Sequence, residues 1–182
     1  MTIDALLDRG PVIPVATIAD AGDAVPLARA LLDGGLRTIE VTLRTPAALA
    51  AIERIAAEVP EIAVGAGTVT GADDARAARD AGARFLVAPG ATPSLLDALA
   101  ASGLPYLPGC ATPSELIALQ ERGLHAAKLF PAEAVGGVAF AQALAGPFPR
   151  MRLCPTGGID QDGAAAYLAL PNVACVGGTW LT

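Results

Sequence analysis

Eight short apolar runs, rich in β-branched residues, recur along the chain with helix-like segments between them. They begin 20 to 26 residues apart and cover residues 12–18, 38–43, 63–69, 85–90, 106–110, 126–131, 152–158 and 174–180. An interval of that length holds one strand, one helix and two short loops. Eight such units in succession predict an α/β fold, and their near-constant length favours a single (β/α)8 TIM barrel.

The segments between the runs carry signals for helix starts. Thr92 and Thr112 are each followed by proline, so each is expected to cap a helix that begins at that proline. A doubly wound sheet usually has G-x-G-x-x-G after its first strand, whereas this chain has ADAGDAV there. The chain ends at Thr182, directly after the eighth run. We therefore expect residues 1–182 to form one (β/α)8 barrel catalytic domain, with the helix after strand eight missing.

The composition is that of a globular protein with an acidic surface. The 182 residues are 53% hydrophobic and 16% charged, and the net charge is −6. Such a chain lacks the basic face that nucleic acid or an anionic membrane would bind, although a local site can still bind a small anion. The longest uncharged run is broken by Pro171 and by Gly177–Gly178, and the N-terminus lacks the features of a signal peptide. We expect a cytoplasmic protein without nucleic-acid or membrane partners.

The three cysteines are scattered through the chain. Cys110, Cys154 and Cys175 show no C-x-x-C spacing and no histidine at a metal-ligand distance along the sequence. This pattern predicts buried, reduced thiols and no metal site.

Alternation along the runs identifies polar side chains that would face the interior of a barrel. In TIEVTLR (38–44) the apolar side chains suit the layer under the helices, so Glu40 and Arg44 would face inward together with two threonines. By the same alternation Lys128 faces inward in the run 126–131, and Arg152 shares a face with Thr156 in the run 152–158. The active end of such a barrel lies at the C-terminal ends of the strands.

Lys128 is the only lysine among 12 basic residues, and its neighbours are apolar. Lysine is almost never buried unless it is paired or functional, so an internal ion pair with Glu40 and a reactive amine are both open interpretations. Burial and a nearby cation such as Arg44 would favour the neutral amine, which can attack a carbonyl. Glu40 would then carry protons, with Glu133 in reserve, and Arg44 would hold a substrate carboxylate.

Two glycine pairs end the last two predicted strands. Gly157–Gly158 and Gly177–Gly178 lie where many (β/α)8 enzymes bind phosphate through backbone N–H groups. A single pair is more typical of a tight turn, but two pairs at these strand ends favour a phosphate site.

Several motifs in order resemble one known family. IEVTLRT, VGAGTV, PG, KLFPAE, GPF, CPTGGI and GGTWL, spread from Gly10 to Thr182, are similar to those of 2-keto-3-deoxy-6-phosphogluconate (KDPG) and 4-hydroxy-2-oxoglutarate (KHG) aldolases. The resemblance implies a class I aldolase without metal or cofactor. It would cleave KDPG to pyruvate and glyceraldehyde 3-phosphate in the Entner–Doudoroff pathway, with side activity on KHG. It also implies a homotrimer.

The resemblance further implies roles for individual residues. Lys128 would form the Schiff base, Glu40 would be the general acid and base, and Thr156 would influence stereochemical preference at C4. The remaining substrate-binding residues would be Arg44, Thr68, Pro89 and Phe130. The phosphate-binding residues would be Gly157, Gly158, Gly178 and Thr179. GGTW stands where the family pattern is GGSW, a change that keeps the hydroxyl.

Three alternatives to this function remain open at the level of sequence. A phosphogalactonate aldolase shares the Glu/Arg/Lys set, although Thr156 favours the gluconate epimer. An isomerase or epimerase would use Lys128 only for its charge. A truncated, inactive barrel acting as an oligomeric scaffold would account for the absent final helix.

Overall fold

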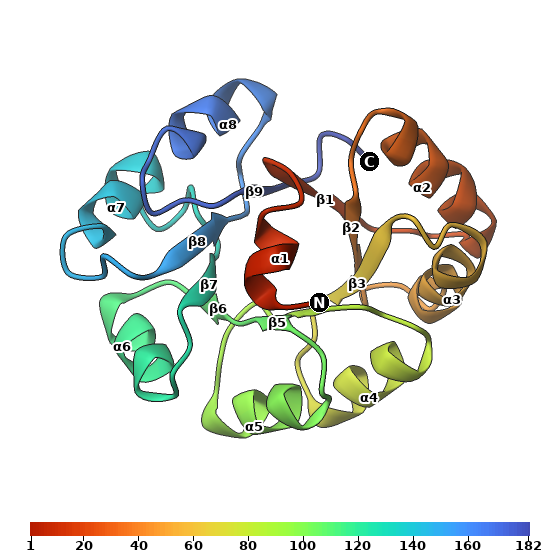
Figure 1. Cartoon of the computed structure of the whole chain (residues 1–182), viewed down its shortest axis with the longest axis horizontal. Coiled ribbons are helices and arrows are strands. Elements are labelled where there is room, and N and C mark those ends of the chain that lie inside the picture. The colour runs from red at the N-terminus through yellow and green to blue at the C-terminus, as the bar shows by residue number, and fades with distance from the viewer.

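The computed structural model describes residues 1–182 as a ring of parallel strands with helices on its outside (Figure 1). The strands are β1 (Val12–Ala16), β2 (Thr38–Thr42), β3 (Ala63–Gly67), β4 (Leu86–Val87), β5 (Tyr106–Leu107), β6 (Gly109–Cys110), β7 (Ala126–Leu129), β8 (Arg152–Pro155) and β9 (Val176–Gly178). Each lies within one of the eight predicted runs. The predicted α/β class with parallel strands is confirmed.

Most of the helices alternate with these strands. They are α1 (Ile3–Leu7), the short 3-10 helix η1 (Ala21–Asp23), α2 (Ala24–Asp33), α3 (Ala48–Glu58), α4 (Ala72–Asp80), α5 (Pro93–Ala101), α6 (Pro113–Glu121), α7 (Gly137–Leu144) and α8 (Gln161–Leu168). Thr92 and Thr112 cap α5 and α6 as predicted, each accepting a hydrogen bond from a backbone N–H of the first turn. No helix follows β9, and the Thr182 hydroxyl donates to the Val15 carbonyl of β1.

The hydrogen-bonded strands form two sheets. The six-stranded sheet has the order β5-β4-β3-β2-β1-β9, and the three-stranded sheet has the order β6-β7-β8. The predicted single strand at 106–110 is divided at Pro108 between the two sheets, because proline has no N–H to continue a ladder. On the other side, isolated parallel bridges join Leu153 to Val173 and Thr156 to Gly177. The two sheets therefore meet at both of their edges.

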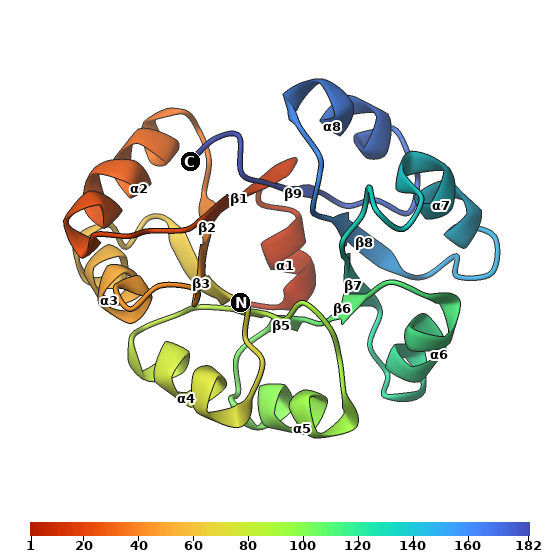
Figure 2. The same ribbon diagram turned by 180° about the vertical axis from the view of Figure 1, so that it is seen from behind.

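Apolar side chains on the outer faces of the strands pack against the helices. Ile39 and Val41 of β2 belong to a cluster with residues of α2, α3 and α4. Ala127 and Leu129 of β7 belong to a second cluster with residues of α6, α7 and α8. The views from the front and from behind place these helices outside the strands (Figures 1 and 2). The predicted alternation along both strands is confirmed.

A third apolar cluster fills the space enclosed by the strands. It combines residues of both sheets with the helix α1: Leu6, Leu7, Ile13, Ala63, Phe85, Val87, Leu107, Ala126, Cys154 and Cys175. Helix α1 crosses the middle of the ring in Figure 1. This helix was not predicted from the sequence, although Thr2 is a good N-cap and its hydroxyl accepts a hydrogen bond from the Ala5 N–H. The cluster closes the end of the ring at which the strands begin.

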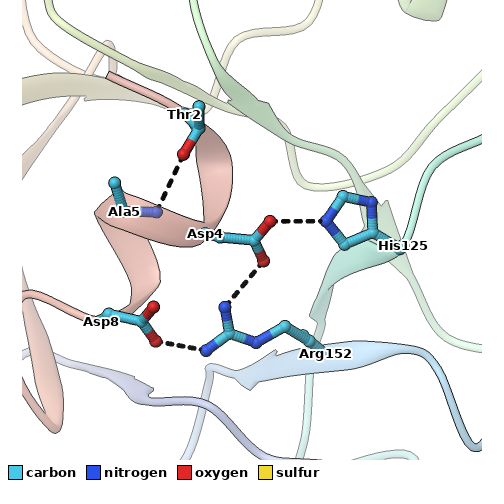
Figure 3. Close-up of polar contacts among 6 residues, drawn as sticks. All are labelled: Thr2, Asp4, Ala5, Asp8, His125 and Arg152. Atoms are coloured by element: carbon cyan, nitrogen blue, oxygen red, sulfur yellow. Dashed lines mark hydrogen bonds and ion pairs between the residues drawn. The ribbon is translucent and has the colours of Figure 1, made fainter.

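Charged groups tie α1 to the strands that it covers (Figure 3). Arg152, the first residue of β8, donates to Asp4 at 2.7 Å and to Asp8 at 2.5 Å. His125 Nε2 lies 2.9 Å from the second Asp4 oxygen. Arg152 was predicted to share a face of its strand with Thr156. Its position at the start of β8 places the guanidinium at the opposite end of the strand from Thr156, where Asp4 of α1 and Asp8, the residue after α1, supply two carboxylates.

The Asp4 interactions predict a pH-dependent contribution to stability. The Arg152 guanidinium, and then His125, hold the pKa of Asp4 below its ordinary value of 3.8. The ionised form therefore stabilises the fold, fully above pH 3.8 and progressively less as the pH falls through the lowered pKa. Asp4→Asn should lower the free energy of unfolding by about 1 kcal/mol at neutral pH, a small value because the carboxylate is 44% exposed. The difference in the free energy of unfolding between Asp4→Asn and the parent should decrease as the pH falls below 3.8.

Urea denaturation at several pH values measures this effect. Asp73→Asn is the matched control, because Asp73 pairs with Arg76 on the surface of α4 and is almost fully exposed. We expect that variant to differ little from the parent at any pH. If the difference in the free energy of unfolding between Asp4→Asn and the parent stayed constant down to acidic pH, that result would contradict the ionic origin of the effect.

The three cysteines are free and buried, as predicted. Burial raises the pKa of Cys110 to about 12, so its thiol stays protonated at neutral pH.

None of the helices is both long and apolar enough to span a membrane.

Candidate active site

The site is built around a buried pair of opposite charges. Lys128 Nζ lies 3.1 Å from Glu40 Oε1, and the two side chains are 5% and 4% exposed. The residues come from different sheets, β7 and β2, and their side chains meet inside the ring because both have the inward parity. Removing either partner would leave the other charge buried and unpaired, which is strongly unfavourable. Each group thus keeps the other in place.

Backbone pairing fixes the position of Lys128 on β7. Its N–H donates to the Pro108 carbonyl at 2.8 Å, and in the ladders Lys128 is opposite Gly109 of β6 and Cys154 of β8. The ammonium nitrogen lies 5.3 Å from the centre of the Phe130 ring, within the range of a cation–π contact. The amine is therefore held between a carboxylate and an aromatic face.

Arg44, two residues after the end of β2, and Thr68, the residue after β3, lie side by side. The Arg44 Nε–H donates to the Thr68 hydroxyl at 3.1 Å. Thr68 has a φ of 62°, the left-handed region that non-glycine residues rarely adopt. Such strain is typical of functional sites. The pair places a guanidinium at the edge of the site, at the C-terminal ends of the strands.

A cavity of about 160 Å³ lies between these groups and the ends of the last two strands. Its lining consists of Val15, Arg44, Lys128, Phe130, Thr156, Gly157, Gly158, Ile159, Gly177, Gly178 and Thr179. Gly157 and Gly158 have φ values of 99° and 82°, so the turn after β8 requires glycine. The cavity therefore brings one amine, one guanidinium and two glycine-rich turns together. That combination suits an anionic carbonyl compound.

The structure brings most of the predicted site residues together at this cavity. Eight of the predicted site residues line the cavity: Lys128, Arg44, Phe130, Thr156, Gly157, Gly158, Gly178 and Thr179. Glu40 and Thr68 are not in the lining but contact residues that are. Glu40 accepts a hydrogen bond from Lys128, and Thr68 accepts one from Arg44. Pro89 is not part of this lining; it lies after β4, where its carbonyl group closely approaches Gly109.

Three lining residues were missed: Val15, Ile159 and Gly177. Alternation could have identified Val15, because Ile13, two positions earlier on β1, also faces the interior. Gly177 belongs to a glycine pair that was recognised, and its Cα lies so close to Thr156 that a Cβ atom would fall 2.3 Å from the Thr156 hydroxyl oxygen.

Glu133, considered as a reserve proton carrier, is engaged elsewhere. Its carboxylate accepts a hydrogen bond from the Tyr167 hydroxyl of α8 at 2.5 Å. Burial and this contact raise the pKa of Tyr167, so the phenol remains a donor. Glu133 is exposed and is not part of the cavity lining. The geometry leaves Glu40 as the carboxylate in contact with Lys128.

A buried amine paired with a carboxylate, between parallel strands of an α/β fold, is the arrangement that class I aldolases use, and these enzymes are lyases. The family model described as KDPG and KHG aldolase matches residues 3–182. The chain belongs to this KDPG and KHG aldolase family.

Curated relatives are similar over almost the whole chain. A 2-dehydro-3-deoxy-phosphogluconate aldolase of Pseudoalteromonas atlantica is 50% identical over 97% of this chain and 82% of its own length. A KHG/KDPG aldolase of Escherichia coli K12 is 49% identical over 98% of this chain and 84% of its own.

Solved structures agree with the fold in detail. A KDPG aldolase of Legionella pneumophila, with pyruvate captured as a covalent carbinolamine intermediate, has a TM-score of 0.96 and 45% identity, covering 99% of this chain and 87% of that one. A Zymomonas mobilis KDPG aldolase with 3-phosphoglycerate has a TM-score of 0.94 and 44% identity, covering 98% and 85%.

Proposed function

We propose that this chain cleaves 2-dehydro-3-deoxy-6-phosphogluconate to pyruvate and D-glyceraldehyde 3-phosphate, with side activity on 4-hydroxy-2-oxoglutarate. The observation that carries the proposal is the buried Lys128–Glu40 pair beside a cavity edged by Arg44 and the glycine turns. The names of the relatives from Pseudoalteromonas atlantica and Escherichia coli support this choice of substrates.

In the first step Lys128 acts as the nucleophile. Its ammonium group gives a proton to the Glu40 carboxylate, and the neutral amine attacks C2 of the keto acid. A C–N bond forms, the π bond of the carbonyl breaks, and the oxygen takes up a proton to give a carbinolamine. Loss of that oxygen as water leaves a protonated imine. The covalent carbinolamine of pyruvate in the Legionella pneumophila relative supports this assignment.

The protonated imine then accepts the electrons of the bond that breaks. Glu40 removes the proton of the C4 hydroxyl, the C3–C4 bond breaks, and glyceraldehyde 3-phosphate leaves while the electron pair moves into an enamine. Protonation of the enamine at C3 and hydrolysis of the imine release pyruvate and restore the amine. Glu40 lies 3.1 Å from the reacting nitrogen, within reach of both proton transfers.

The substrate's two anionic groups can be assigned to two parts of the cavity lining, a guanidinium and the glycine turns. Arg44, oriented by Thr68, is proposed to hold the carboxylate, with Pro89 and Phe130 bordering the pyruvate portion. Thr156, which lines the cavity next to Gly157, is proposed to contact the C4 hydroxyl. The phosphate is assigned to the backbone of Gly157, Gly158 and Gly178 and to Thr179. The 3-phosphoglycerate in the Zymomonas mobilis relative supports a site for phosphorylated compounds.

We further propose that residues 1–182 act as one (β/α)8 catalytic domain. The bridges between the edges of the two sheets and the apolar cluster shared by both support this arrangement. A cytoplasmic homotrimer is proposed from the family resemblance.

Borohydride trapping tests the proposed mechanism. The protein is incubated with pyruvate, reduced with borohydride and digested for mass spectrometry. We expect one reduced pyruvate unit on Lys128, and coupled lactate dehydrogenase should detect pyruvate release from KDPG. Because the chain has one lysine, peptide mapping has to distinguish only Lys128 from the N-terminal amine. Sugar-phosphate turnover without an adduct would favour an isomerase, and assembly without turnover would favour a scaffold.

A further inference from the structure

Gly67, the last residue of β3, lies against the side chain of Glu40. A Cβ atom at this position would fall 2.1 Å from Glu40 Oε1, 2.6 Å from Cγ and 2.7 Å from Cδ. All three distances are shorter than real Cβ contacts allow. Because the stem of the side chain is affected as well as the carboxylate, rotation of the carboxylate alone would not relieve the overlap.

The backbone around Gly67 does not otherwise require glycine. Gly67 is not among the glycines with positive φ, so alanine can adopt its backbone conformation without strain. The neighbouring strands are also fixed, since β2 and β3 pair over five consecutive positions from Thr38–Ala63 to Thr42–Gly67. Every residue of both strands is buried. The strands cannot separate easily, so an added methyl group has to displace the Glu40 side chain.

We propose that Gly67 is a positioning residue, whose missing side chain leaves the space that holds the Glu40 carboxylate against Lys128. This inference rests on the proposed role of Glu40 in proton transfer. Gly67 does not line the cavity, so its contribution is to the geometry of Glu40 and not to contact with substrate. Lys128 keeps its own backbone contacts on β7.

Gly67→Ala is expected to reduce turnover of KDPG about 100-fold, the order of loss produced by a misplaced catalytic group. The borohydride-trapped pyruvate adduct on Lys128 should still form. Exchange of the pyruvate methyl protons in D₂O, which reports proton transfer at C3, should fall in parallel with turnover. Full turnover by a folded Gly67→Ala protein would overturn the proposal.

A double-mutant cycle with Glu40→Gln separates positioning from a general structural effect. If Gly67 acts through Glu40, then Gly67→Ala should cause a further loss of less than about 2-fold in a Glu40→Gln background. Gly65→Ala is the matched control on the same strand, because its Cβ would meet the Phe85 ring at 2.4 Å in the interior cluster. That variant should lower Tm without interacting with Glu40→Gln. Equal losses from Gly67→Ala in both backgrounds would contradict the inference.

A measurement of Tm tests the proposal even if Gly67→Ala folds too poorly for an activity assay. Glu40→Ala removes the atoms that the new methyl group would meet. The Tm of the double variant Gly67→Ala with Glu40→Ala should therefore equal that of Glu40→Ala alone, and an additional fall in Tm would overturn the proposal. If Glu40→Gln keeps full turnover, the proposed function of Glu40 is wrong. If Glu40→Gln loses turnover and Gly67→Ala does not, only the positioning role of Gly67 is wrong.

Discussion

Lys128→Met is expected to abolish the trapped pyruvate adduct and to lower KDPG turnover by about 10⁴-fold or more. The amine is the nucleophile in the proposed reaction, and the chain contains no second lysine that could replace it. Methionine keeps a long, flexible apolar side chain in the space of the lysine stem, so the change removes mainly the amine. Mass spectrometry after borohydride treatment and the coupled assay measure the two effects.

This substitution also leaves the Glu40 carboxylate buried without its partner. The loss of stability from breaking such a pair is about 3–5 kcal/mol, so the folded fraction has to be measured with activity. Lys128→Met combined with Glu40→Gln is the matched control, because it removes both charges and should recover part of the lost Tm. Because Glu40→Gln alone should still form the adduct, absence of the adduct in this more stable double variant would exclude unfolding as the cause. An adduct mapped to the N-terminal amine, or substantial turnover by Lys128→Met, would contradict the assignment.

Glu40→Gln is expected to separate imine formation from bond cleavage. The amide keeps the shape of the carboxylate but cannot accept the C4 hydroxyl proton, so turnover should fall by about 10²–10⁴-fold. Lys128 remains present, and we expect the pyruvate adduct still to be trapped. Single-turnover measurements of pyruvate release, together with the yield of adduct, distinguish the two steps.

Glu133→Gln is the control for this experiment. Glu133 is exposed and bonded to Tyr167, outside the cavity, so its substitution should leave turnover within about 2-fold of the parent. If Glu133→Gln were the variant that lost proton transfer, or if Glu40→Gln retained full turnover, the role of general base would have to move to another group.

Much of the fold could be predicted because parallel strands covered on both faces alternate two kinds of environment. Ile39 and Val41 suit the layer under the helices, which left Glu40 on the interior side of the same strand. The same rule turned Lys128 inward. Alternation reports only the face of a strand, however, and not the partners that a side chain meets. The contacts of Arg152 with Asp4 and Asp8 were therefore not predicted.

Contacts between distant segments explain the other differences. Helix α1 is only five residues long, too short to be stable alone, and it forms because Leu6 and Leu7 enter the space enclosed by the strands. Glu133 could be excluded from the site only after Tyr167 was found to hold its carboxylate. Gly67 carries no side chain, so its relation to Glu40 could not be seen before the strands were placed.

The sequence by itself determined the parallel α/β class, the inward direction of Lys128 and Glu40, and the glycine turns at the ends of β8 and β9, because periodicity and turn chemistry are local properties. Only the tertiary structure decided that Lys128 and Glu40 meet at 3.1 Å, that Arg152 faces α1, and that Gly67 makes room for a carboxylate. These are distances between residues far apart in the chain. They are set by the packing of the two sheets around a common interior.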